Sequence, residues 1–218
     1  SGTFNIFTCE NESNYTLGKA IASGSRVIGS NANGAIVYKY ADIQNMTEAD
    51  AITVIKCDHK DKNGSYKLDG NPCHYCNEEI VATVSYTADG SEQTDLFSDI
   101  YDAFERANEA GTATITLYKK IADSELTRDV NVTGNVTLAL NGKKLGYSFV
   151  SLTVEVSDGG MLTVDGDGKM AMPIIVNENA KLTVNGGEIA TVMIYKDGDA
   201  VIGGGFIEDL DVNGNVKL

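Results

Sequence analysis

The 218-residue sequence predicts a mainly β fold: a right-handed parallel β-helix with a helix-containing N-terminal cap, preceded by a small Cys/His knuckle and a small α+β segment. Three observations lead to this prediction. A strand-and-corner pattern recurs through residues 129–218, a stretch with helical spacing lies just before it, and cysteine and histidine cluster before that. We expect four segments: 1–56, 57–83, 84–128 and 129–218.

The repeat consists of alternating apolar residues followed by Asn-Gly, Asp-Gly or Gly-Gly. Its last apolar positions are 140, 164, 184, 202 and 218, which are spaced by 24, 20, 18 and 16 residues. Alternation predicts a strand with one buried face, and the Asn-Gly type of pair allows the positive φ angles of a sharp corner. A unit of this size cannot bury its apolar face alone, so successive units must stack.

A second strand is expected eight residues before each of these positions. Its inward register is filled by apolar residues throughout: Val132, Val156, Val176, Ile194 and Leu210. Two or three strands per coil make a parallel β-helix. An antiparallel sandwich is the rival, but the fixed order of strand, strand and corner favours stacked coils. Ser1-Gly2 resembles a cloning remnant and the last copy ends within a strand, so we expect a fragment of a protein with further coils or a cap.

The segment before the coils carries a helical pattern. Apolar residues at 96, 97, 100, 104 and 107 predict a helix over 95–107, which Thr94 or Asp95 would cap and Gly111 would end. Strands are expected over 81–86 and 113–118. Such a helix would cover the open end of the first coil, where bare core and unpaired strand groups would otherwise face water.

The first 56 residues predict short elements without apparent chemistry. We expect strands over 4–7 and 52–55, a short helix over 16–23, and a hairpin in which 26–28 and 35–38 flank the turn residues 31–34.

Three of the four cysteines gather with both histidines in the next segment. Cys57-x-His59 and Cys73-x-x-Cys76 form two close pairs across a turn-rich loop, an arrangement typical of a structural zinc site with ligands Cys57, His59, Cys73 and Cys76. Disulfides and free thiols remain alternatives. Four protein ligands leave no open position for water, so the site is not expected to be catalytic. His74, inside the turn, suits a ligand role less well, and Cys9 is expected to be a small buried residue.

Charge excludes two classes of partner. Lys and Arg number 17 against 31 Asp and Glu, a formal net charge of −14, which argues against nucleic acids and anionic membranes. No apolar run approaches the roughly 20 residues that span a bilayer, so direct membrane insertion is not expected. The sequence also begins without the charged and apolar regions of a signal peptide.

Together, these motifs resemble repeated modules of very large surface proteins of Gram-positive gut bacteria. The resemblance rests on the Cys-x-His and Cys-x-x-Cys pairs, the strand at 81–86, and residues 95–104, 113–117 and 135–142; residues 15–24 resemble the closing segment of a preceding module. It implies a secreted or wall-attached protein whose neighbours are other modules of the same chain. It also implies an adhesin-like role toward host proteins, because some similar proteins bind immunoglobulins as B-cell superantigens.

Strand alternation locates a candidate partner-binding face. If the register above points inward, Ile175 and Met193 become neighbours on the outer surface, with Tyr195 beside them. Acidic residues are expected to rim them, namely Glu155, Asp209 and Asp211. An apolar patch with a polar edge is typical of an interface. Alternatively, a connection or the next module covers it.

Two other functions compete with a non-enzymatic binding module. A carbohydrate-active enzyme, such as a polysaccharide lyase or glycosidase, would need paired carboxylates, for which Asp165 and Asp167 are the candidates. Acidic residues beside glycine are more simply explained by corner geometry, and arginine, which would hold an acidic substrate, is scarce. We therefore expect no catalytic residues. A passive stalk between other domains is the third possibility.

Overall fold

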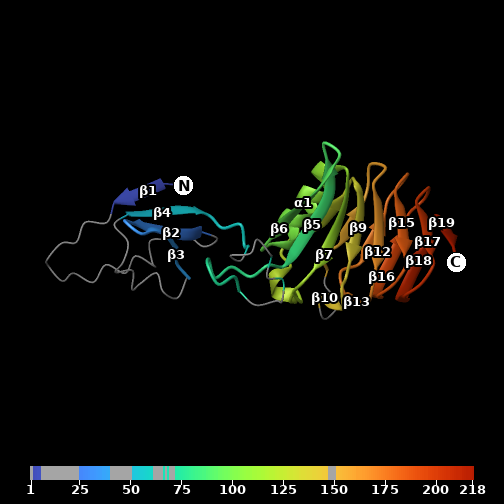
Figure 1. Cartoon of the computed structure of the whole chain (residues 1–218). Coiled ribbons are helices and arrows are strands. Elements are labelled where there is room, and N and C mark those ends of the chain that lie inside the picture. Colours follow the sequence, from blue (N-terminus) through green and yellow to red (C-terminus); the bar gives the residue numbers. More distant parts are fainter. Residues whose placement is uncertain are drawn as a thin grey trace. The chain divides into compact units, whose positions relative to one another are not determined.

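The computed structural model describes residues 2–5, 25–39, 51–60, 66, 68, 72–146 and 151–218 (Figure 1). The chain divides into two compact units, Ser1–Glu79 and Ile80–Leu218. The predicted fold class is confirmed: strands dominate, and the second unit is a parallel β-solenoid that follows one helix. The unit boundary falls inside the expected 57–83 segment, and the finer division into four segments stays a prediction.

The first unit contains an antiparallel sheet with the order β1-β4-β2-β3. Its strands are β1 (Gly2–Asn5), β2 (Ser25–Asn31), β3 (Gly34–Val37) and β4 (Ala51–Lys56). The predicted hairpin is confirmed, because Asn31 pairs with Gly34 across a two-residue turn, and Gly34 takes a φ of 122° that L-residues rarely adopt. The expected helix over 16–23 and Cys9 lie outside the described residues.

The second unit begins with a cap of three strands and one helix. These are β5 (Ala82–Ala88), β6 (Ser91–Phe97), α1 (Ile100–Ala110) and β7 (Thr112–Leu117). The helix start predicted at residue 95 is wrong. Asp89 and Gly90 both have positive φ, and this tight turn sends residues 91–97 back along β5 as a strand. The true N-cap is Asp99, whose side chain accepts a hydrogen bond of 2.7 Å from the Tyr101 N–H, and Gly111 ends the helix as expected.

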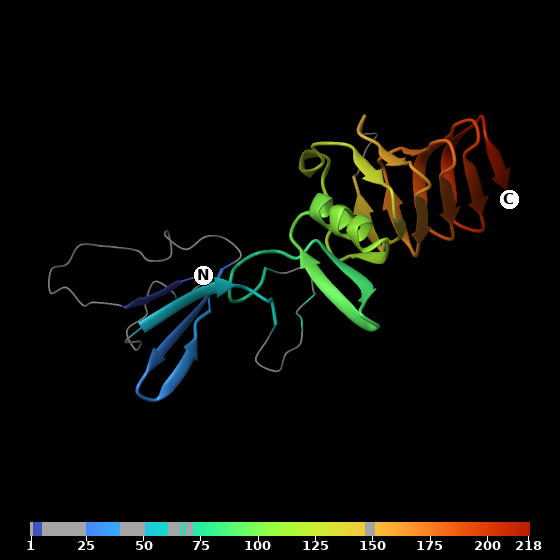
Figure 2. The same ribbon diagram turned by 90° about the horizontal axis from the view of Figure 1, so that it is seen from above.

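The solenoid follows the cap and extends to the C-terminus (Figure 2). Its first turns have three strands per coil. The first coil holds β8, β9 and β10, the second β11, β12 and β13, and equivalent strands pair in parallel. As the coils shorten, no corner separates the third strand of one coil from the first strand of the next. The two strands are therefore continuous in β16, which pairs with both β13 and β14, and in β18, which pairs along β16. The strands are β8 (Val130–Val132), β9 (Asn135–Ala139), β10 (Lys143–Leu145), β11 (Val154–Val156), β12 (Met161–Asp165), β13 (Gly168–Met170), β14 (Ile174–Val176), β15 (Lys181–Val184), β16 (Glu188–Ile194), β17 (Asp199–Ile202), β18 (Phe206–Val212) and β19 (Asn215–Lys217).

The exact register differs from the expectation at both ends of the repeat. Val164 pairs with Leu138 rather than Leu140, because the corner before β9 has only two residues (133–134) and the equivalent corner before β12 has four (157–160). Ile194 pairs with Val212 rather than Leu210. The following corner compensates for this two-residue difference, because it has four residues (195–198) after β16 and only two (213–214) after β18. Both shifts are even-numbered, so inward residues stay inward.

Buried side chains stack in register through the coils. One ladder joins Val132, Val156, Val176 and Ile194, all of which are almost completely buried. The corners carry the positive φ angles expected of Asn, Asp and Gly, as at Asn141 and Gly142.

The helix covers the open end of the first coil, as predicted. Phe104 and Ala107 of α1 belong to the same buried cluster as Val130 and Val132. The Asn108 side chain adds polar contacts, because its amide donates to the carbonyl of residue 131 at 2.7 Å and its oxygen accepts two backbone N–H groups of residues 133 and 134.

Candidate metal centre and candidate binding face

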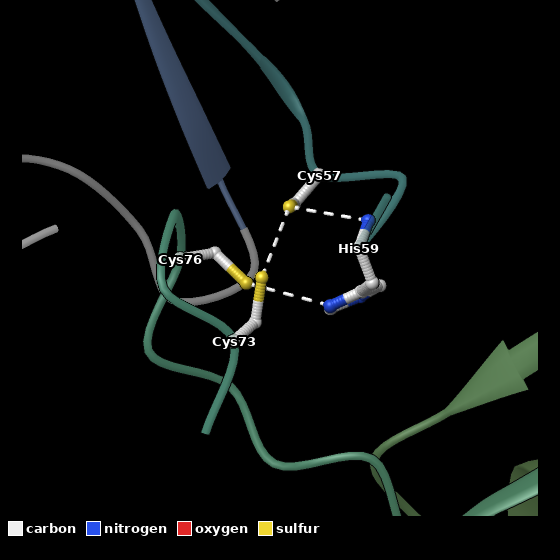
Figure 3. Close-up of side chains that lie close together, drawn as sticks. All are labelled: Cys57, His59, Cys73 and Cys76. Carbon is white, nitrogen blue, oxygen red and sulfur yellow. Dashed lines mark hydrogen bonds between the residues drawn. The ribbon is translucent and has the colours of Figure 1, made fainter. Parts of the chain in front are cut away.

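The four predicted ligands come together in the first unit (Figure 3). Cys57 and His59 follow β4 directly, and Cys73 and Cys76 lie on a tight turn 16 and 19 residues further along the chain. Their donor atoms all lie within 4.8 Å of one another. The Sγ atoms of Cys57 and Cys73 are 3.7 Å apart, and the Sγ of Cys76 lies 3.6 Å from Nδ1 of His59. The group could therefore hold a metal ion.

Local backbone structure points these atoms inward. His59 has a φ of 56°, and its N–H donates to the Cys57 sulfur at 3.3 Å. The second turn is closed by two backbone hydrogen bonds of 2.8 Å, from the Cys73 N–H to the Glu78 carbonyl and from the Asn77 N–H to the Cys73 carbonyl. Asn77 takes a φ of 59°, which asparagine tolerates better than most residues. Each ligand pair thus ends at a residue with positive φ, His59 in the first and Asn77 after the second.

The three sulfurs influence one another's protonation. The hydrogen bond to Cys73 raises the pKa of the Cys57 thiol to about 11, and the hydrogen bond to Cys57 raises the pKa of Cys76. The hydrogen bonds that Cys73 accepts from Cys57 and Cys76 lower the pKa of Cys73. Among the three sulfurs, the thiolate form of Cys73 is therefore the one that its neighbours stabilise. A bound divalent cation would allow all three to be thiolates, because its charge offsets their repulsion.

Two separations within the group fit a tetrahedral ion. A tetrahedron with Zn–S bonds of about 2.3 Å and a Zn–N bond of about 2.1 Å has S···S edges of about 3.8 Å and S···N edges of about 3.6 Å. The two shortest contacts, 3.7 Å between sulfurs and 3.6 Å between sulfur and nitrogen, match these edges. A disulfide fits less well, because an S–S bond is only about 2.05 Å long. Cys57, Cys73 and Cys76 are free thiols, and His74 is not part of the group.

Two residues near the cluster were missed by the sequence reasoning. Arg26 of β2 stacks 4.2 Å above the ring of Tyr75 and forms an ion pair of 2.7 Å with Asp58, so it joins the sheet to both ligand turns. The Glu78 carboxylate lies 3.6 Å from Nε2 of His59. Nothing in the sequence indicated this role for Arg26, because its partners Asp58 and Tyr75 are 32 and 49 positions away.

The described part of the first unit buries few apolar side chains. Among its described side chains, the buried apolar ones are Val27, Ile52 and the cluster thiols Cys57 and Cys76. A metal that binds only the folded state would therefore contribute to stability where hydrophobic burial is limited.

The candidate binding face lies on the solenoid. Ile175 of β14 pairs directly with Met193 of β16, as predicted, and both side chains are partly exposed. Tyr195, which follows β16, is 48% exposed. The expected rim needs one correction, because Met193 pairs with Asp211 while Asp209 lies beside Thr191. Glu155 pairs with Ile175 on the other side.

The carboxylates considered for catalysis lie at a solenoid corner. Asp165 ends β12, and its side chain accepts a hydrogen bond of 2.8 Å from the N–H of Gly166. Asp165 and Asp167 are both exposed. The contact of Asp165 is the local turn role that acidic residues beside glycine commonly have.

Comparison of the chain with protein-family models, with curated proteins and with solved structures finds no match. Within the described part of the chain, no helix combines the length and apolar character needed to cross a bilayer.

Proposed function

We propose that this chain is a non-enzymatic binding module of a bacterial surface protein, in which the solenoid presents the Ile175–Met193–Tyr195 face to a host protein. One observation carries the proposal: two apolar side chains are held side by side on an outer sheet face, with acidic residues at both ends of the row. Hydrogen-bonded parallel strands on each side hold this row rigidly, which lowers the entropy lost on binding.

The character of the row supports a protein partner. From one coil to the next the outer positions read Glu155, Ile175, Met193 and Asp211, and the ring of Tyr195 lies exposed nearby. Methionine and tyrosine are enriched in protein interfaces, and a polar rim around apolar residues is the usual arrangement. The resemblance to modules of gut bacterial surface proteins favours host serum or mucus proteins, with immunoglobulin as the first candidate, and a location outside the cell or in the wall.

Zinc is the metal we assign to the Cys/His cluster, in a structural role. Three sulfurs and one imidazole nitrogen, all within 4.8 Å of one another and with two separations of tetrahedral length, form a donor set that zinc prefers. When bound, the ion would join the turn that follows β4 to the turn that carries Cys73 and Cys76. All four positions would be filled by protein atoms, which suits a structural ion.

The binding proposal is tested by presenting the pure chain to immunoglobulin and to fractionated serum and mucus proteins. Ile175→Asp combined with Met193→Asp should weaken binding at least about 30-fold, since buried charges at an interface centre are costly, and should leave melting almost unchanged. The matched control is Thr163→Asp with Thr183→Asp. These residues are also register neighbours with partly exposed side chains, but they lie on the other sheet.

Retained binding in the first double variant, or equal loss in the control, would contradict the proposed face. A specific glycan cleaved by the pure chain would contradict the non-enzymatic assignment.

The zinc proposal predicts about one zinc per chain by elemental analysis of protein purified without added metal. His59→Gln should lose most of the metal, whereas His74→Gln, two residues from Cys76 but outside the group, should retain it. A disulfide between any two of the three described cysteines, found by mass spectrometry of the native protein, would contradict the proposal.

A further inference from the structure

We infer that His59 binds the metal through Nδ1 and that Glu78 is the positioning residue that holds the opposite ring nitrogen. This inference rests on the proposed zinc site. It concerns which nitrogen is the ligand and what keeps the ring in place, neither of which follows from the spacing of the four ligands.

The orientation of the imidazole ring distinguishes its two nitrogens. Nδ1 lies 3.6 Å from the Sγ of Cys76, the length of a tetrahedral S···N edge, and Figure 3 shows this nitrogen turned toward the sulfurs. Nε2 lies 3.6 Å from the carboxylate of Glu78. The side chain of His59 is only 10% exposed, so the ring is confined between these two contacts.

Glu78 is well placed to act on the ring because its backbone already belongs to the ligand turn. Its carbonyl accepts the Cys73 N–H at 2.8 Å, and its own N–H donates a hydrogen bond to the Cys76 sulfur. The residue therefore contacts three of the four ligand residues. Its side chain is 26% exposed, and a small movement would shorten the 3.6 Å separation to the length of a hydrogen bond from Nε2–H.

A carboxylate that accepts the distal N–H of a ligand histidine has two effects. It keeps the proton on Nε2, which leaves the Nδ1 lone pair free for the metal, and it makes the imidazole a stronger donor. Loss of such a partner typically weakens metal binding by about 10–100-fold. Here the same residue connects the Cys-x-x-Cys turn to the histidine of the other turn, so it would also keep the two halves of the site in register.

The first experiment uses the zinc-loaded, ¹⁵N-labelled full chain without any substitution at Glu78. Long-range ¹⁵N–¹H correlations of the imidazole should show Nδ1 bound to metal and Nε2 protonated. The chain has only two histidines, so the His74→Gln variant assigns the signals. Zinc bound through Nε2 of His59 would overturn the inference.

The second experiment measures zinc affinity by competition with a chelator. Glu78→Ala should lose about 10–100-fold, while Glu78→Gln, which keeps an acceptor oxygen, should lose less than about tenfold. Glu79→Gln is the matched control, because it removes the same charge one residue away, and it should leave affinity unchanged. Unchanged zinc affinity in Glu78→Ala, with zinc still at one per chain, would overturn the inference about Glu78 but leave the zinc proposal standing. Failure of the native chain to bind zinc would overturn the zinc proposal as well.

Discussion

Ile174 and Ile175 lie side by side in β14, yet the structure gives them opposite environments. Ile174 is completely buried and pairs with Val154 and Val192 in the adjacent coils, whereas Ile175 is partly exposed on the outer face. The same substitution to alanine at each position therefore isolates the effect of the face. Both residues lie in the same strand between the same two neighbouring strands, and the substitution removes the same atoms from each.

Ile174→Ala should be strongly destabilising. Replacing a buried isoleucine by alanine costs about 2–5 kcal/mol, and more where the surroundings cannot collapse into the cavity. Strands hydrogen-bonded on both sides cannot move inward easily, so we expect about 3–4 kcal/mol, which for a unit of this size lowers the melting temperature by about 10–15 °C. Ile175→Ala should cost less than about 1 kcal/mol.

Thermal and urea unfolding of the full chain, followed by circular dichroism, measure this difference. The chain contains no tryptophan, so intrinsic tryptophan fluorescence cannot serve. Similar losses in the two variants, or a larger loss in Ile175→Ala, would refute the assignment of inner and outer faces. The proposed binding surface would then have to be abandoned, since Ile175 would belong to the core.

Two further predictions concern the cap. Asn108→Ala should lower the unfolding free energy by about 1–3 kcal/mol in urea titration, because it leaves two backbone N–H groups of the turn after β8 without their acceptor; an unchanged midpoint would contradict this role. The pKa of Glu125 is lowered by Lys119 and by the Ala122 N–H, so its stabilisation is present above pH 4.5 and is lost as pH falls through the lower, folded-state pKa. Glu125→Gln should therefore reduce the acid sensitivity of melting in that range, by less than about 1 kcal/mol for so exposed a pair; an unchanged pH profile would contradict it.

The residues of the candidate metal centre were predictable because their signal is local. Cys57-x-His59 and Cys73-x-x-Cys76 are short motifs, and close spacing on a turn brings two donors together whatever the rest of the fold does. The supporting residue Arg26 could not be found this way. It reaches the two turns from a strand that is distant in sequence, and such a contact depends on how the sheet and the turns pack.

The helix start shows the opposite case, in which a local signal was ambiguous. Leu96 and Phe97 fit the helical spacing that continues through Ile100 and Phe104, but they equally fit a strand. Pairing with β5 across the turn at Asp89 decided in favour of the strand, because seven residues of ladder were formed there.

The sequence by itself determined that the second unit is a stack of coils. The signals that show this are local in the sequence: the repeat period, the alternation of apolar residues and the Asn-Gly corners. Only stacking of the coils buries the apolar faces that result. Tertiary structure alone decided the register, which placed Val212 rather than Leu210 beside Ile194 and Leu138 rather than Leu140 beside Val164. The physical reason is that corners of different length satisfy the same alternation. Shifts by two residues keep every side chain on its face, so only hydrogen bonding between coils distinguishes them.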